Sequence, residues 1–306
     1  MKKTGSYIAS FILSILFIFT LIAAVGTLTV NKFLNADSMI ALAKEKNCST
    51  LVHNSLEKYF SERYSTSGIP ADVYMDALDE EYLQNVINIR IKLGFDSLRN
   101  GDTIHDHSTD PTYILNSDLE QSISKFYNDY AESINYEKDA KFDEKLSSAK
   151  KSAYKIIMEY CDIFKFNSLS AHGVLQKLKP VYSRLPLLTV ISVSASAFLA
   201  LLLLLVNLKE KRSALYWLGI SALISGAMGA VPCIYLISSS YFNSFTIKQP
   251  QIYTAYTSAM NLGTEKFMIN SIIAACCGIV LVILYAIISK SKAKSEKDNS
   301  PDIQKN

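Results

Sequence analysis

The sequence predicts an all-α membrane protein with four transmembrane helices and a helical extracytoplasmic domain inserted between the first two. Four stretches contain no charged residue, namely 4–31, 185–208, 213–247 and 267–289. A helix rises about 1.5 Å per residue and the hydrocarbon core is about 30 Å thick, so about 20 apolar residues cross it. Each stretch is therefore long enough to span a bilayer. The polar segment 31–183 separates the first stretch from the other three.

Lys and Arg beside the predicted spans indicate the orientation, because basic residues close to a span stay on the cytoplasmic side. They occur before the first span, in the turn between the second and third, and after the fourth: Lys2, Lys3, Lys209, Lys211, Arg212, Lys290, Lys292 and Lys294. These clusters share one side only if both termini are cytoplasmic. We therefore predict a multi-pass protein of the plasma membrane with these parts: cytoplasmic N-terminus 1–6, transmembrane helix 7–30, extracytoplasmic helical domain 31–183, transmembrane helix 185–208, cytoplasmic turn 209–213, transmembrane helix 214–237, extracytoplasmic loop 238–266, transmembrane helix 267–289 and cytoplasmic tail 290–306.

The first span has one competing interpretation, a cleavable secretory signal ending near Ala23 to Gly26. The central region of a signal peptide holds about 7–15 apolar residues, whereas 7–30 has the length of a full span. We favour an uncleaved anchor. The topology of the remaining chain is the same under either interpretation.

The net charge of +3 combines two opposite populations. Segment 31–183 carries 18 Lys and Arg against 23 Asp and Glu, and the rest of the chain carries 13 against 5. The basic excess lies next to the spans and does not form a stripe interleaved with aromatic residues. It is typical of an orientation signal, and we expect no nucleic-acid partner.

The predicted spans contain no ionisable side chain, which disfavours proton-coupled transport or a charge-selective channel. The third span instead carries small residues at four-residue spacing along two tracks, Ala222, Gly226, Ala230 and Ser221, Ser225, Gly229. Such tracks let two helices approach closely, either within one chain or between two copies. We favour packing within the chain and keep a homo-oligomer as the alternative.

Apolar periodicity predicts helices in the extracytoplasmic domain. A coiled-coil-like seam runs along Phe142, Leu146, Ala149, Ala153, Ile156, Tyr160 and Ile163. A capping box at Ser117 to Glu120 precedes the stripe Leu119, Ile123, Phe126, Tyr127, Tyr130 and Ile134. A further helix is predicted over 50–64, with Val52, Leu56, Tyr59 and Phe60 on one face. Pro70 suits the first turn of a helix that continues toward residue 100. The pattern over 87–95 also alternates like a strand, but a lone strand has no partner, so we predict a helix.

Three segments carry a resemblance: Leu56 to Phe60, Ser67 to Val73 and Asp79 to Ile87. They resemble a group of uncharacterised Gram-positive bacterial multi-pass membrane proteins in which a helical outside domain follows an N-terminal anchor. This resemblance implies a helix near Ile87 and implies no activity. The topology alone is similar to permeases of the FtsX and MacB type, which implies a cytosolic ATPase partner. Here the short N-terminus and the short turn at 209–213 offer an ATPase little surface.

Metal-ligating residue types cluster in one place, at His105, Asp106, His107 and Asp110. Consecutive residues seldom all reach one ion, and the flanking Gly, Asp, Thr, Ser and Pro residues are typical of a solvated loop. We therefore expect no metal site there, with His105, His107 and Asp110 as the only candidates. No nucleophile elbow, phosphate-binding loop or zinc-protease helix occurs, so we expect neither a cofactor nor an enzyme.

The five cysteines divide by position. Cys233, Cys276 and Cys277 lie in predicted spans, where they are expected to pack as apolar side chains. Cys48 and Cys161 lie in the predicted extracytoplasmic domain, where an oxidising exterior permits a disulfide. The spacing does not decide whether they are bonded.

The sequence thus favours a non-enzymatic envelope protein, a scaffold or sensor that acts through its helical domain and a membrane partner. Its expected partners are the lipid bilayer and another protein of the envelope or membrane. The alternative is a permease-like subunit of an ABC-type complex, which has support from topology only. A hydrolase using the His105 loop is a third and weaker hypothesis.

Overall fold

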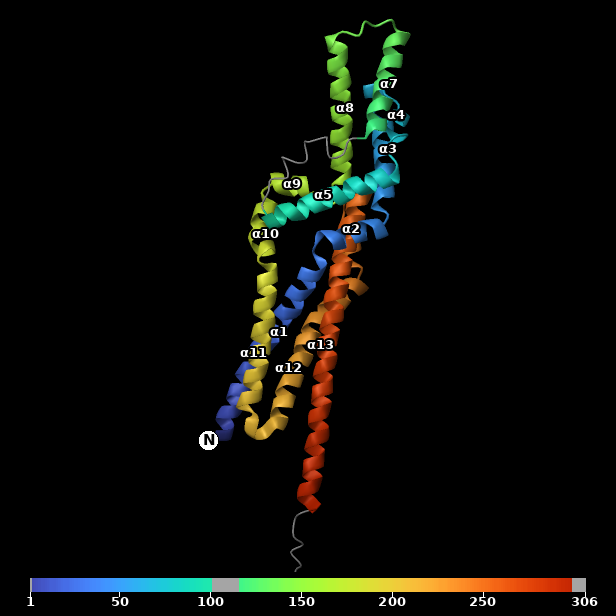
Figure 1. The fold of residues 1–306 in the computed structure, drawn as a ribbon. Helices are drawn as coiled ribbons and strands as arrows, with labels where there is room; N and C mark the ends of the chain where they lie inside the picture. The colour runs from blue at the N-terminus through green and yellow to red at the C-terminus, as the bar shows by residue number, and fades with distance from the viewer. Residues whose placement is uncertain (1, 101–115, 299–306) are drawn as a thin grey trace, which may run out of the picture. The chain divides into compact units, whose positions relative to one another are not determined.

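The computed structural model describes residues 2–100 and 116–298, and within these ranges the chain forms helices and turns without a strand (Figure 1). The chain divides into two compact units. The span unit comprises Met1–Phe33, Arg184–Phe242 and Asn261–Asn306, and the helical unit comprises Leu34–Ser183 and Asn243–Met260. The helical unit covers the segment 34–183 of the predicted domain 31–183 and also takes in part of the predicted loop 238–266.

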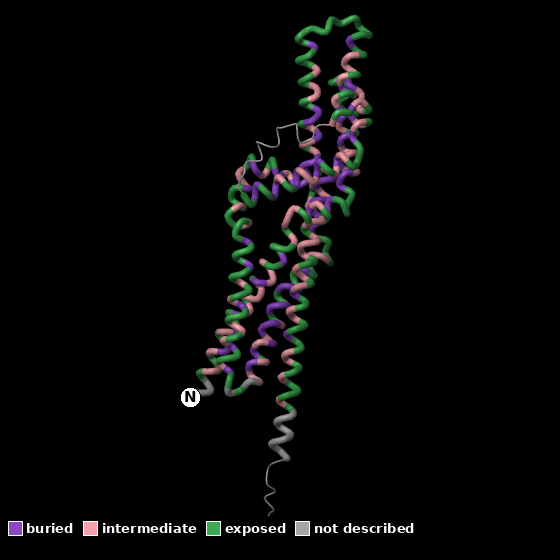
Figure 2. The backbone as a smooth tube through the Cα atoms, in the orientation of Figure 1, coloured by how far each residue is buried: buried purple, intermediate pink, exposed green. Residues whose placement is uncertain are grey.

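Among the described residues, four helices are long and apolar enough to cross a membrane: α1 (Lys2–Phe33), α11 (Leu185–Val206), α12 (Lys211–Ser238) and α13 (Pro250–Asp298). The span unit contains the first three and the part of α13 from Asn261 onward. This confirms the all-α class of the described chain, and the four long apolar helices are consistent with a membrane protein. A single 3-10 turn, η2 (Leu208–Glu210), joins α11 to α12. Most large apolar side chains on these helices are exposed, as side chains facing lipid would be (Figure 2).

Polar and aromatic contacts hold the span unit together. Helix α1 packs against α11 and α12, and Phe17, Leu203 and Trp217 form a buried cluster between them. The Asn207 side chain donates to the Ser10 hydroxyl at 2.9 Å, and Asn270 donates to the Thr29 hydroxyl at 2.9 Å. These bonds give the two side-chain amides hydrogen-bond partners, which the hydrocarbon of a bilayer cannot provide.

The predicted loop 238–266 is mostly helical. It contains the 3-10 helix η3 (Tyr241–Ser244), and α13 begins at Pro250, well before the predicted start of the fourth span at 267. Proline suits the first position of a helix because its missing N–H has no partner there anyway. The helix also continues into the predicted tail, as far as Asp298.

The helical unit is organised around α5 (Glu80–Asn100), which packs against five other helices (Figure 1). These are α2 (Ala36–Glu45), α3 (Cys48–Ser67), α8 (Ala140–Cys161), α9 (Phe166–Ala171) and α10 (Val174–Ser183). Helix α3 confirms the prediction over 50–64, with Val52, Leu56 and Phe60 buried. The unit also contains α4 (Asp72–Met75) and α7 (Ser117–Ser133).

The helical assignment over 87–95 is correct, because Leu83, Ile87 and Ile91 are buried along one face of α5. Gly94 is needed on that face: a Cβ at this position would overlap the ring of Phe166. The predicted continuous helix from Pro70 to residue 100 is interrupted. Pro70 instead precedes the short helix α4, and α5 begins separately at Glu80.

Helices α7 and α8 form an antiparallel hairpin (Figure 1). The Asn116 side chain caps α7 by accepting from the backbone N–H groups of Asp118 and Leu119, so the cap lies one residue before the predicted capping box. Along α8 the predicted seam holds at Phe142 and Ala153. It shifts by one position near the end of α8, with Ile157 buried and Ile156 only half-buried, and the last predicted seam residue, Ile163 just after α8, is buried.

Candidate functional site

The metal candidates His105, His107 and Asp110 lie outside the residues that the structure describes. Within the described parts of the chain, no group of three or more His, Cys, Asp or Glu side chains is placed to hold a metal ion.

Cys48 and Cys161 both lie in the helical unit, as the first residue of α3 and the last residue of α8. Both are fully buried and both are free thiols, so the disulfide that the sequence permitted is absent from the structure. Burial raises the pKa of the Cys48 thiol to about 11 and raises that of Cys161 further above its ordinary value. Protonated, buried thiols are poor nucleophiles. The physical role of these two cysteines in the structure is packing.

The small-residue tracks of α12 face α13. A Cβ on Gly226 would overlap the backbone of Ser271 and Ala275, and a Cβ on Gly229 would overlap the Ser271 side chain. Nearby Ala222, Ser225 and Ala230 are buried as well. The residues predicted for helix packing are therefore brought together on one face, and the glycines pack within the chain.

A narrow void adjoins this contact, between α1, α12 and α13. Its lining consists of apolar side chains and glycines together with the two serines Ser225 and Ser271. The void contains no room for the centre of a water-sized sphere and no charged group lines it. Such a lining is typical of imperfect packing between helices and is not typical of a site that binds a substrate or an ion.

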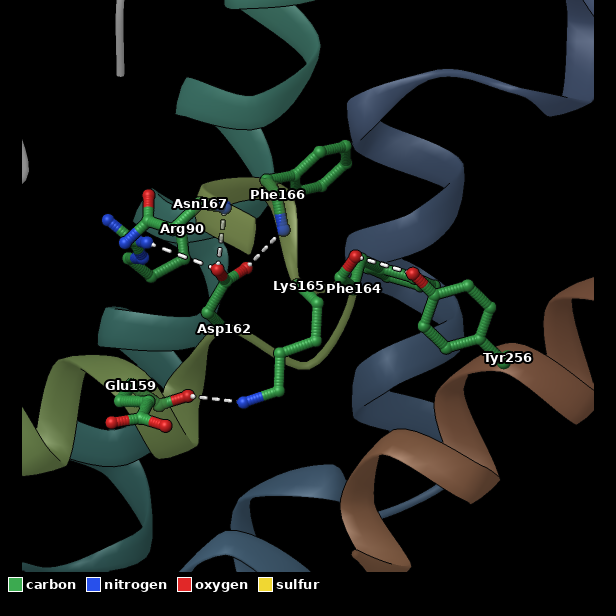
Figure 3. A network of polar contacts seen from close by, with 8 residues as sticks. All are labelled: Arg90, Glu159, Asp162, Phe164, Lys165, Phe166, Asn167 and Tyr256. Carbon is green, nitrogen blue, oxygen red and sulfur yellow. Dashed lines mark hydrogen bonds and ion pairs between the residues drawn. The ribbon is translucent and has the colours of Figure 1, made fainter. Parts of the chain in front are cut away.

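The most buried charges of the described chain form an ion pair that the sequence analysis did not identify. The Nη2 atom of Arg90, on α5, lies 3.3 Å from Oδ2 of Asp162, just after α8 (Figure 3). Arg90 is 2% exposed and Asp162 is 4% exposed. The sequence does contain a sign that Arg90 is buried, because helical spacing places Arg90 on the same face as Leu83, Ile87 and Gly94.

Asp162 also organises the turn that follows α8. Its carboxylate accepts from the backbone N–H of Phe166 and of Asn167, both at 2.9 Å, at the start of α9 (Figure 3). In the same turn, the Tyr256 hydroxyl of α13 donates to the Phe164 carbonyl at 2.6 Å. Residues from α5, the α8–α9 turn and the start of α13 thus meet at Asp162 to Phe166. By contrast, the Nε and Nη1 atoms of Arg90 are buried without a hydrogen-bond partner. The cluster stabilises a junction and contains no free nucleophile or substrate pocket.

The α7–α8 hairpin gathers three exposed large apolar side chains of the helical unit within seven positions, while Tyr64, Leu178 and Val181 are exposed to a similar extent elsewhere in that unit. Near its base, Leu119, Ile123, Ala153 and Ile157 are buried. Toward its end, the same apolar stripe continues onto Tyr130, 58% exposed, and Ile134, 52% exposed, and Tyr136 in the turn beyond α7 is 40% exposed (Figure 2). The predicted stripe is therefore real, but only its first half packs within the chain.

The turn of this hairpin has a defined backbone. Asn135 adopts a left-handed conformation with φ of 50°, which Asn tolerates better than most residues. The Asn135 N–H donates to the Glu132 carbonyl and the Tyr136 N–H donates to the Ala131 carbonyl at 2.8 Å. Phe126 and Tyr130 stack one turn apart, with ring centroids 6.4 Å apart. The exposed side chains of Tyr130 and Tyr136 thus flank this turn.

Comparison with known proteins gives no family for the chain. No protein-family model matches it, and neither the curated proteins nor the solved structures contain a significant match. The resemblance to Gram-positive membrane proteins and the topological similarity to FtsX and MacB permeases therefore stay expectations.

Proposed function

We propose that this chain is a non-enzymatic plasma-membrane protein, a scaffold or sensor whose helical unit lies outside the cell and binds a protein partner through the α7–α8 hairpin. The observation that carries the proposal is the exposure of Tyr130 and Ile134 at the end of an apolar stripe whose first residues are buried, together with the exposed Tyr136 in the turn that follows. Tyrosine and large aliphatic side chains give large contact areas, and tyrosine is enriched at protein interfaces.

Three features support an anchoring role for the four spans. The glycine tracks of α12 are used to pack α13, and the polar side chains Asn207 and Asn270 bond to hydroxyls of α1. The lining of the void beside α12 carries no charge. These features are those of a stable anchor, and they offer no ionisable relay for transport.

The permease-like alternative predicts a surface that an ATPase could grip at the cytoplasmic ends of the spans. The connection between α11 and α12 is one 3-10 turn, Leu208–Glu210. So short a turn favours the interaction protein over the ATPase-driven subunit.

The orientation is tested with single cysteines in a background where the native cysteines are replaced. Ser147→Cys lies on an exposed part of α8 and Gly5→Cys lies at the start of the first span, where a side chain meets no neighbour. A membrane-impermeant maleimide should label intact cells at position 147, and should label position 5 only after lysis. The opposite pattern would reverse the proposed topology.

The partner is tested by photocrosslinking in native membranes, with the photoreactive residue at Ile134 and, as a matched exposed control, at Glu57 of α3. A specific protein adduct at Ile134 that is absent at Glu57 supports the proposal. Adducts at Glu57 but none at Ile134 contradict the hairpin assignment. A third variant carries the photoreactive residue at Arg212, and capture of an ATPase there would favour the permease-like alternative.

A further inference from the structure

The end of the hairpin carries a surplus of acidic side chains around its exposed apolar residues. We name residues 129–145 the hairpin tip. Its acidic residues are Asp129, Glu132, Glu137, Asp139, Asp143 and Glu144, and its basic residues are Lys138, Lys141 and Lys145. All nine of these side chains are exposed. The tip therefore has a net negative charge.

Contacts within the tip engage two of its three lysines. Lys138 Nζ lies 3.1 Å from the Glu132 carboxylate, and Lys145 Nζ lies 6.0 Å from the centre of the Tyr136 ring. The latter geometry is that of a cation–π contact, in which an aromatic face attracts a cation. Lys138 and Lys145 therefore already have favourable contacts inside the tip. Because six carboxylates outnumber three ammonium groups, the electrostatic potential around the tip is negative.

One aromatic ring of the tip already accepts an ammonium group, and Tyr130 presents a second ring that is 58% exposed. A ring surrounded by carboxylates attracts Lys or Arg through both its quadrupole and its charged neighbours. Ile134, which is 52% exposed, adds an aliphatic side chain to the surface of the same tip. The exposed tyrosine ring, the carboxylates and the aliphatic side chain of Ile134 together favour a partner with alternating cationic and apolar side chains.

Charge also separates this partner from the other classes of occupant. A second copy of the same tip would oppose carboxylates to carboxylates, and like charges facing each other are unfavourable. The anionic surface of a lipid leaflet and the phosphates of a nucleic acid are repelled for the same reason.

We infer that the hairpin tip binds a basic protein segment in which Lys or Arg residues flank aliphatic or aromatic side chains. This inference rests on the proposed function and specifies the chemistry of the partner. Backbone hydrogen bonds from Asn135 to Glu132 and from Tyr136 to Ala131 define the turn at the centre of the tip.

The test uses the purified full-length chain in nanodiscs of zwitterionic lipid and three fluorescent synthetic peptides of equal length. The first alternates Lys with Leu and Trp, the second replaces each Lys by Glu, and the third keeps Lys and replaces Leu and Trp by Ser. Fluorescence anisotropy should show saturable binding of the first peptide, weakening as salt is raised. Binding of the second and third should be at least about tenfold weaker, equivalent to about 1.4 kcal/mol.

Two charge-reversal variants decide whether the tip is the binding surface. Asp129→Lys with Glu137→Lys should weaken binding of the Lys peptide by about tenfold or more, since it removes the negative surplus. The matched control, Glu57→Lys with Glu62→Lys, reverses two exposed carboxylates on α3 and should leave the affinity unchanged. Far-ultraviolet circular dichroism confirms that both variants keep their helices. Equal affinities of the wild type and the tip variant, or equal binding of the Glu peptide, would overturn the inference.

The cellular crosslinking at Ile134 separates this inference from the proposed function. An adduct to a partner segment without Lys or Arg, or to a second copy of this chain, overturns the basic-segment inference and leaves an interaction at the hairpin. Adducts at Glu57 with none at Ile134 overturn the proposed function itself. The proposed function and the basic-segment inference are both supported by an adduct between Ile134 and a cationic partner segment. This adduct should be lost in the charge-reversal variant of the tip and retained in the charge-reversal variant of α3.

Discussion

Arg90 and Asp162 form an ion pair in the interior of the helical unit, with Nη2 and Oδ2 3.3 Å apart, but their hydrogen bonding is unequal. Asp162 also accepts two backbone N–H groups, whereas two nitrogens of Arg90 have no partner. Removal of one partner from a buried pair leaves an uncompensated charge and typically costs about 3–5 kcal/mol. Asp162→Ala should lose this amount, because it leaves the Arg90 charge unpaired and uncaps α9.

Arg90→Met should cost less than Asp162→Ala, because it removes the unpartnered nitrogens and leaves Asp162 with its two backbone bonds. Chemical unfolding of the full chain in detergent micelles, followed by circular dichroism, measures both changes. The exposed pair Lys58 and Glu62, 3.9 Å apart on α3, provides the control. Glu62→Ala should change stability by less than about 1 kcal/mol. Equal losses for the two buried variants would show that the Asp162 backbone bonds contribute little.

Gly226 sets the distance between α12 and α13, because a side chain there would overlap the α13 backbone at Ser271 and Ala275. Gly226→Leu should force the helices apart and lower stability by at least about 1–3 kcal/mol, the usual range for overpacking. Thermal unfolding in a mild detergent measures the loss. Ala227→Leu is the matched control, since Ala227 is the next residue and is exposed. A loss of equal size at both positions would contradict the proposed close contact.

Local sequence patterns predicted the helices well where one periodicity dominates. The small-residue spacing of α12 identified a close packing face, and the stripe Val52, Leu56 and Phe60 identified α3. Along α8 the three-and-four spacing left Ile156 and Ile157 as competing candidates, and the packing of α8 against α5 and α3 buries Ile157. A periodic pattern gives the face of a helix more reliably than the exact residue.

Features that depend on distant residues were not predicted. Arg90 lies 72 positions before Asp162, so their pairing follows from tertiary packing and not from either local sequence. The cap of α7 moved to Asn116 because that residue also donates to the Ala77 carbonyl and bonds the Tyr154 hydroxyl through its backbone. The early start of α13 likewise depends on contacts within the helical unit, including Gln251 with Ser55 and Tyr256 with Phe164.

Cys48 should make the stability of the helical unit sensitive to alkaline pH. Burial raises its pKa from 9.0 to about 11, so between these values the unfolded chain loses the thiol proton while the folded chain keeps it. The folded state then binds more protons, and the free energy of unfolding falls as pH rises. The contribution is fully present below about pH 9 and is lost by about pH 11.

Unfolding curves between pH 7 and pH 11 under reducing conditions measure this effect. Cys48→Ala removes the titrating group, so the difference between variant and wild type should be constant below pH 9 and should shift in favour of the variant above it. Tyr74, whose pKa burial raises to about 12, titrates in both proteins and cancels in the difference. A difference that stays constant up to pH 11 would show that the Cys48 thiol titrates normally in the fold.

The apolar stripe of α7 should separate into a folding half and a binding half. Ile123 is fully buried and Ile134 is 52% exposed, although both belong to the same helical stripe. Ile123→Ala should destabilise the helical unit by about 2–5 kcal/mol, because it removes buried methyl groups and leaves a cavity. Ile134→Ala should change stability by less than about 0.5 kcal/mol, as is usual for exposed positions. Unfolding measurements on the two variants give this comparison directly.

Partner capture then distinguishes binding from folding at the same stripe. With the photoreactive residue moved to Ser133, which is also exposed, Ile134→Ala should reduce the yield of the partner adduct several-fold while stability stays unchanged. A buried residue can lower capture only by lowering the folded fraction, so a loss of adduct in a fully stable variant assigns Ile134 to the interface. An unchanged adduct yield together with a large loss of stability would place Ile134 in the folding half of the stripe and move the interface elsewhere on the helical unit.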